Sequence, residues 1–301
     1  MRRPPRSAPR LLLAARSLDG VTYASRERLL EIQTRFREPE SLAVTLVKAL
    51  DAGAEGVLSA PSPALRTALA ELTRAVPIHA VLPTLTPQGY RVLEPGVEPL
   101  IARTRRDADL TARVRMSLTS LRRLSAFRQG DFAARVPVLL EAAARLLPRR
   151  GLVGVVIAAP LTDAALAGDH RAFFTLLPGF VHARFRAAAG FETRNPGLLL
   201  RRLREWGVAP DLVVGPMNPR GLGMKPSPEE TLAELARGDG VPFLATETRA
   251  GGLCTLAEGA RYALEGGAHG VAPDLAEMDE VTLELRGVGE MLAGRSASLR
   301  S

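Results

Sequence analysis

The sequence predicts an α/β fold, a (β/α)8 TIM barrel with a helical insertion between strands 3 and 4. Short apolar runs alternate with longer amphipathic stretches, which is the pattern of βα units around a parallel sheet. A chain of 301 residues suits eight such units and one insertion. The alternative, an open doubly wound sheet, would need a Gly-rich fingerprint after the first strand, but Ser17, Leu18, Asp19 and Gly20 stand there.

Eight apolar runs are predicted to be the strands. They are residues 11–16, 56–60, 78–83, 152–159, 189–194, 212–216, 242–247 and 269–274. The stretches between them include 196–206, 228–237 and 256–265, which have helical periodicity and begin or end at Pro, Gly or a capping residue. Each strand is therefore followed by a segment that can return the chain along the outside of the barrel.

The domain prediction is one barrel over residues 10–301, after a disordered basic tail over residues 1–9. The insertion covers about 95–149, and two apolar helical faces are expected in it. Their residues are Val114, Leu118, Leu121 and Leu124 in one, and Val138, Leu139, Ala142 and Leu146 in the other. We interpret the insertion as a helical cap or a surface through which a homo-oligomer could form, and a helix lying on a membrane is the less favoured alternative.

Composition restricts the class of protein. Cys254 is the single cysteine, so a disulfide framework within the chain is excluded and a reducing, cytoplasmic location is expected. The net charge is +8, but all except two of the 40 basic residues are arginines that are spread along the chain, and aromatic residues make up 4%. Nucleic-acid binding is therefore not predicted, because stacking platforms are scarce.

The last two predicted units contain a glycine pattern. Gly251 and Gly252 follow the seventh run, and the stretch 263–271 reads Ala-Leu-Glu-Gly-Gly-Ala-His-Gly-Val. This pattern resembles the phosphate-binding barrels of histidine and tryptophan biosynthesis and other aldolase-type barrels. The resemblance implies that backbone N–H groups of Gly251 and Gly252 bind a phosphate. The sequence departs from that family after the eighth run, where Asp274 stands in place of a glycine turn.

Polar residues that follow the strands are the candidate site, because active sites of these barrels lie at the carboxyl ends of the strands. The candidates are Arg16 after the first run, Glu192, Arg194 and Asn195 at the fifth, Asn218 after the sixth, Glu247, Arg249, Gly251 and Gly252 after the seventh, and Asp274 at the eighth. His79 and His269 stand at the starts of their runs, so they are expected at the opposite end. A histidine-built metal site is therefore not predicted.

Three carboxyls are predicted to be catalytic: Glu192, Glu247 and Asp274. Burial at a barrel mouth can raise the pKa of a carboxyl toward neutrality, which suits a general acid or base. We predict no cofactor, and the alternative is that the same carboxyls hold Mg²⁺, which prefers oxygen ligands. A shift in thermal stability on adding a divalent metal would distinguish the two.

The substrate is expected to be a small anionic metabolite. Arg16, Arg194 and Arg249 flank the acids and could bind a carboxylate or phosphate through two parallel hydrogen bonds. Asn195 and Asn218 are expected to contribute to substrate binding from the fifth and sixth units.

Lys225 is the fourth residue predicted to be catalytic. It lies in a Gly- and Pro-rich loop, residues 217–228, in a chain that has only one other lysine, Lys48. A lysine can clamp an anion as a point charge, or lose its proton and attack a carbonyl, which arginine does not do. Class I aldolases, which these barrels resemble, carry a Schiff-base lysine on the sixth strand, and Lys225 lies beyond that position.

The preferred function is an aldolase-type enzyme, a carbon–carbon lyase or isomerase. Glu247 or Glu192 would act as base, and the arginines would bind the anionic substrate. Two alternatives stay open: a Mg²⁺-dependent enzyme that uses the same acids, and a non-catalytic barrel whose Arg-rich insertion binds a partner protein, a membrane surface or RNA.

Overall fold

Eight parallel strands form the centre of the protein. The computed structural model describes residues 8–84, 114, 116, 132–143, 147, 150–238 and 240–298. The strands are β1 (Leu13–Ala14), β2 (Val57–Ser59), β3 (Ile78–Leu82), β4 (Leu152–Ile157), β5 (Ala188–Glu192), β6 (Leu212–Pro216), β7 (Phe243–Thr246) and β8 (Gly270–Val271). Seven of the predicted runs contain one strand each, the fifth run overlaps β5, which begins one residue earlier at Ala188, and the strands pair in sequence order from β1 to β8.

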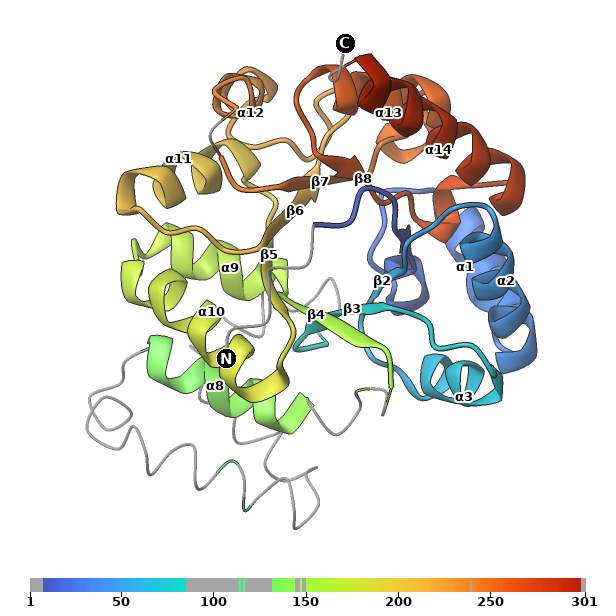
Figure 1. Ribbon diagram of the computed structural model, residues 1–301, viewed down its shortest axis with the longest axis horizontal. Helices are drawn as coiled ribbons and strands as arrows, with labels where there is room; N and C mark the ends of the chain where they lie inside the picture. Colours follow the sequence, from blue (N-terminus) through green and yellow to red (C-terminus); the bar gives the residue numbers. More distant parts are fainter. Residues whose placement is uncertain are drawn as a thin grey trace.

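The sheet closes on itself. Bridges join Leu11 to Val271 and Ala14 to Asp274, and the backbone N–H of Leu12 donates to the Val271 carbonyl at 3.1 Å. The first and last strands are thus neighbours, and the helices lie outside the ring of strands (Figure 1). The α/β barrel predicted from the sequence is confirmed.

The helices follow the strands. They are α1 (Arg26–Arg35), α2 (Pro39–Asp51), α3 (Pro63–Glu71), α8 (Phe132–Ala143), α9 (Ala159–Ala167), α10 (Arg171–Phe185), α11 (Pro196–Trp206), α12 (Pro228–Leu235), α13 (Leu256–Glu265) and α14 (Val281–Ser298), with the 3-10 helices η1 (Arg16–Asp19), η3 (Ala250–Gly252) and η4 (Leu275–Glu277). The local sequence determines where several helices begin. The side chains of four N-cap residues each accept a backbone N–H of the first turn: Ser25, Ser62, Ser227 and Thr255.

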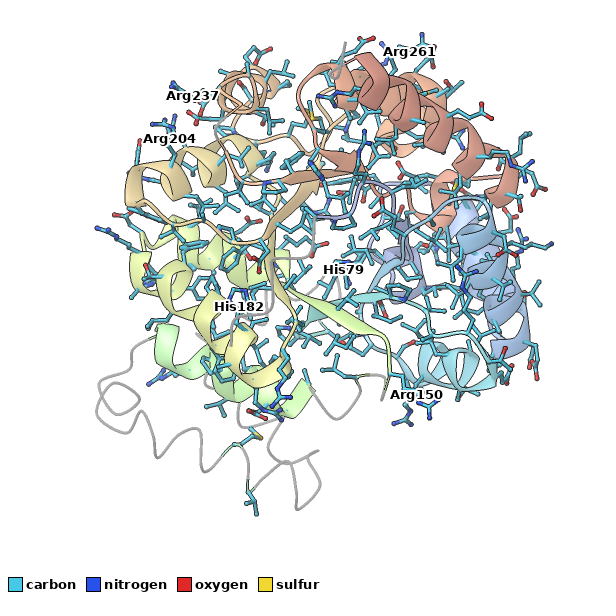
Figure 2. The ribbon with its side chains drawn as sticks, in the orientation of Figure 1. His79, Arg150, His182, Arg204, Arg237 and Arg261 are labelled. Carbon is cyan, nitrogen blue, oxygen red and sulfur yellow. The ribbon has the colours of Figure 1, made fainter. Side chains whose placement is uncertain are left out.

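Arginines lie mainly on the outer helices. Figure 2 shows Arg204, Arg237 and Arg261 at the outer surface, where Arg204 and Arg237 pair with Glu234 of α12. His79 is the second residue of β3, and His269 comes directly before β8. Both histidines are therefore at the amino ends of their strands, as predicted.

The insertion is described only in part. Helix α8 packs against α10, where Arg184 makes two hydrogen bonds to Glu141 at 2.6 and 3.0 Å. The predicted apolar face of Val138, Leu139 and Ala142 is buried. Leu118, Leu121, Leu124, Leu146 and the tail over 1–7 lie outside the described residues. Over the described part of the chain, no helix combines the length and the apolar character needed to cross a membrane.

Candidate active site

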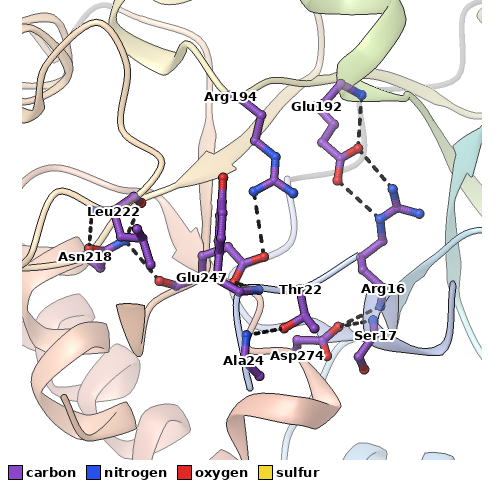
Figure 3. Close-up of polar contacts among 12 residues, drawn as sticks. Arg16, Ser17, Thr22, Ala24, Glu192, Arg194, Asn218, Leu222, Glu247 and Asp274 are labelled. Carbon is purple, nitrogen blue, oxygen red and sulfur yellow. Dashed lines mark hydrogen bonds and ion pairs between the residues drawn. The ribbon is translucent and has the colours of Figure 1, made fainter. Parts of the chain in front are cut away.

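The carboxyl ends of the strands surround a small polar cavity. It has a volume of about 20 Å³, which suffices for roughly one water molecule. Its lining residues are Ala14, Arg16, Val21, Glu192, Thr193, Arg194, Pro216, Thr246, Glu247, Ala272 and Asp274. The structure thus brings together Glu192, Glu247 and Asp274 from β5, β7 and β8, with Arg16 and Arg194 beside them (Figure 3).

Glu192, the last residue of β5, is held by Arg16. The guanidinium donates through Nε and Nη2 to the two carboxylate oxygens, each at 3.3 Å, and the backbone N–H of Ala159 donates at 3.1 Å. Burial acts to raise the pKa of Glu192, but Arg16, Arg194 and these hydrogen bonds together lower it. Glu192 therefore stays ionised and balances the charge of Arg16.

Glu247 follows β7 in a conformation that side chains rarely adopt, with φ at +52°. Such strain is found at functional sites, where the surrounding structure maintains it. Its carboxylate accepts a long hydrogen bond, 3.4 Å, from the backbone N–H of Tyr23 and lies 3.8 Å from the Arg194 guanidinium. Burial raises the pKa of Glu247 to about 7, opposed by Arg194 and assisted by Asp274. This carboxyl can therefore gain or lose a proton near neutral pH.

Asp274 joins the last strand to the first. One carboxylate oxygen accepts the backbone N–H groups of Arg16 and Ser17, at 2.6 and 3.1 Å, and the other accepts that of Ala276 at 2.9 Å as the N-cap of η4. Burial raises the pKa of Asp274, although these hydrogen bonds oppose the shift. Its oxygens are thus used to position the loops of β1 and β8.

Two further carboxyls belong to the site: Asp19, which the sequence places just beyond the end of the first predicted strand, and Glu277, which was not predicted. Glu277 is buried and accepts the backbone N–H groups of Arg249 and Asp274 at 2.8 and 2.9 Å; burial and the charge of Glu247 raise its pKa to about 8. Burial likewise raises the pKa of Asp19 to about 6, and Asp19 lies 3.8 Å from Arg16. The spacing Asp274-x-x-Glu277 is that of a capping box, which could have identified Glu277.

Buried carboxyls outnumber the guanidinium groups at this mouth. Asp19, Glu192, Glu247, Asp274 and Glu277 interact with one another, and Arg16 and Arg194 lower the pKa of members of the group. Like charges in a dry site must be neutralised by cations or by protons. Burial and mutual repulsion raise the pKa values of Glu247 and Glu277 to about 7 and 8, so the two carboxyls together bind a proton at neutral pH and titrate as a pair.

This proton predicts how stability depends on pH. The pKa values of Glu247 and Glu277 are raised in the folded state from 4.5 to about 7 and 8, so their contribution is complete below pH 4.5 and is lost as the pH rises through those values. We expect the free energy of unfolding in urea to fall between pH 5 and 8 by several kcal/mol, because a change of one pKa unit is worth about 1.4 kcal/mol. Glu277→Gln should flatten this dependence, and a wild-type stability that rises over the same interval would contradict the assignment.

The remaining polar candidates, Asn218, Asn195 and Arg249, are not among the residues that line the cavity. Asn218 donates from Nδ2 to the carbonyls of Leu222 and Glu247, at 2.9 and 3.1 Å, and so holds the loop after β6 against Glu247. Asn195 is the N-cap residue of α11 without a capping hydrogen bond from its side chain. Arg249 points away from the cavity lining: its guanidinium donates to the carbonyls of Cys254 and Glu277.

Gly251, Gly252 and Lys225 do not line the cavity. Gly251, in η3, packs so closely on the loop before α1 that a Cβ atom there would lie 2.6 Å from the Tyr23 carbonyl oxygen, whereas Gly252 has open space beside it. Lys225 is exposed in the loop after β6. The roles predicted for these three residues in phosphate or substrate binding and in catalysis stay predictions.

The metal hypothesis also stays untested. Within the described residues, no group of three or more His, Cys, Asp and Glu side chains is arranged to hold a metal ion.

A closed ring of eight parallel strands with outer helices and a polar mouth at the strand ends defines a (β/α)8 barrel protein. No family model matches the chain, and no curated protein matches its sequence.

Solved structures similar to this chain are aldolase and aldo-keto reductase barrels. A protein of Pseudomonas aeruginosa assigned to the aldo-keto reductases is 15% identical over 97% of this chain and 94% of its own, with a TM-score of 0.52. An aldolase designated QR15 is 14% identical over 86% of this chain and 91% of its own, with a TM-score of 0.43. An aldo-keto reductase from Brucella melitensis is 13% identical over 93% of this chain and 88% of its own, with a TM-score of 0.45. At such identities the first likeness supports the barrel fold alone.

Proposed function

We propose that this chain is an aldolase-type barrel enzyme, a carbon–carbon lyase or isomerase, that moves a proton at a carbon next to the carbonyl of a small anionic metabolite. The observation that supports the proposal is Glu247, a buried carboxyl at the strand ends whose pKa lies near 7. A general base or acid works best when its pKa is close to the working pH. A cytoplasmic location is part of the proposal and is favoured by the single cysteine.

Each group has a defined part in this chemistry. The Glu247 carboxylate accepts the proton, the electron pair of the broken C–H bond forms a C=C bond, and the carbonyl oxygen takes the negative charge. Arg194, 3.8 Å from Glu247, binds the substrate carboxylate or phosphate. In the isomerase direction Glu247 returns the proton to a neighbouring atom. In the lyase direction Glu247 accepts the proton of the β-hydroxyl, a C=O bond forms there, and the electron pair of the broken C–C bond gives the same enolate.

The experiment uses exchange with solvent, because it detects proton abstraction without knowledge of the natural co-substrate. Purified protein is incubated in D₂O with single small 2-oxo acids and phosphorylated ketones, and loss of the α-proton signal is followed by ¹H NMR. We expect at least one compound to exchange faster than in the same buffer with heat-denatured protein, with saturation at high concentration. Exchange at the background rate for the whole panel would contradict the proposal.

Lys225 provides a separate prediction. Because its side chain is exposed and lies outside the cavity lining, we expect borohydride with the exchanging keto acid to leave no reduced adduct on Lys225. Lys225→Arg should retain the exchange rate, since a positive charge in the loop suffices for a clamp, whereas Lys225→Ala should raise the substrate concentration needed for half-saturation. An adduct mapped to Lys225 by mass spectrometry would establish the covalent role instead.

A further inference from the structure

Tyr23 lies beside the barrel mouth, in the loop between η1 and α1, where it contacts Arg194 and Glu247. It belongs to the segment 20–25, which begins at Gly20 in a left-handed conformation after η1 and ends at Ser25, the N-cap of α1. Val21 of the same segment lines the cavity. The segment therefore forms part of the roof above Glu247.

Loops from three other strands fit closely around Tyr23. The Arg194 guanidinium, after β5, lies 4.8 Å from the centre of its ring. A Cβ atom at Gly223, after β6, would lie 3.1 Å from the ring and its hydroxyl, and one at Gly251, after β7, would lie 2.6 Å from the Tyr23 carbonyl oxygen. Glycine at these two positions, both with positive φ, leaves room for the tyrosine.

The cavity lined by Val21, Arg194 and Glu247 is too small for a metabolite. Its volume is about 20 Å³, and each heavy atom of a substrate needs roughly the space of the one water that fits. Pyruvate, one of the smallest 2-oxo acids with a proton next to the carbonyl, needs about six times that space for its heavy atoms. A substrate can therefore reach Glu247 only after the roof has moved.

The contacts that hold Tyr23 in place are weak enough to break. Its side chain is 39% exposed, its backbone N–H donates to Glu247 over a long 3.4 Å, and a cation–π contact at such an exposed site is weak. Arg194 contacts both the Tyr23 ring and Glu247. An anion that binds Arg194 thus competes for the group that holds the ring.

We propose that Tyr23 is the lid residue of the mouth, and that the carboxylate or phosphate of the substrate displaces its ring from Arg194 and thereby opens the cavity to Glu247. The inference rests on the proposed function for the identity of the ligand. The closure itself rests on the contacts of the 20–25 segment. Because the backbone N–H of Tyr23 also donates to Glu247, any movement of the 20–25 segment that accompanies displacement of the ring changes both access to the base and its environment.

The test measures access to Glu247 without any turnover. The full-length protein is treated with a water-soluble carbodiimide and glycine ethyl ester, which convert accessible carboxyls to amides, and the rate at Glu247 is measured by peptide mass spectrometry. We expect Tyr23→Ala to increase this rate about tenfold. Tyr23→Phe, which keeps the ring, should match the wild type, as should Leu253→Ala, a control at an exposed side chain of the neighbouring loop.

A second variant guards against a folding effect of Tyr23→Ala. Gly223→Ala places a methyl group against the ring and should also increase labelling of Glu247, whereas labelling at the exposed Glu205 should stay constant in all variants. Equal labelling of Glu247 in the wild type, Tyr23→Ala and Gly223→Ala would overturn the lid. If the lid variants label faster and no 2-oxo acid exchanges, the lid stands and the proposed reaction falls.

Discussion

Replacement of Glu247 by glutamine is expected to reduce deuterium exchange by about 10²–10⁴-fold, the usual contribution of a positioned general base. Glutamine has nearly the shape of glutamate and can still accept the N–H of Tyr23. It cannot take up a proton at neutral pH. The loss should therefore affect the maximal rate much more than the substrate concentration at half-saturation.

The pH dependence gives a second measurement on the same residue. The base must be ionised to accept a proton, so the exchange rate of the wild type should rise with pH through the pKa of Glu247, about 7, and level off above it. The matched control is Glu205→Gln, the same chemical change in an exposed pair with Arg202 on the outside of α11. Exchange in Glu247→Gln at the wild-type rate would assign the base to another residue.

Loss of Asp274 is expected to produce the largest change in stability. Its carboxylate accepts three backbone N–H groups, from Arg16, Ser17 and Ala276, and thereby joins the loop of β8 to that of β1 where the barrel closes. Asp274→Ala leaves these buried donors without the acceptor that they use, and each unsatisfied donor costs about 1–3 kcal/mol. We expect the free energy of unfolding to fall by about 3 kcal/mol or more.

Urea unfolding followed by circular dichroism measures this change, with Asp51→Ala as the control. Asp51 pairs with Arg74 at the surface, where both side chains are well over half exposed, so its loss should change stability by less than about 1 kcal/mol. Equal effects of the two substitutions would show that Asp274 contributes little to barrel closure and would favour a role in binding.

The arrangement of strands and helices could be predicted from local patterns. Periodicity and capping depend on residues a few positions apart, which is why a strand is found at each of the eight predicted runs. The same logic predicted that Glu192, Glu247 and Asp274 converge, because parallel strands present their carboxyl ends at one mouth. Strand lengths were less predictable: β8 ends at Val271, before Pro273, which has no N–H to donate.

The part that each side chain plays at the mouth was decided by tertiary contacts. Glu192 and Glu247 look equivalent in the sequence, yet a two-point contact with Arg16 keeps one ionised, whereas burial brings the pKa of the other near 7. Arg249 faces Cys254 and Glu277 rather than the cavity. Local patterns are enough to predict the barrel and which strand ends meet. Desolvation and long-range pairing depend on distances across the fold, so contacts between distant segments were needed to place Tyr23 in the site.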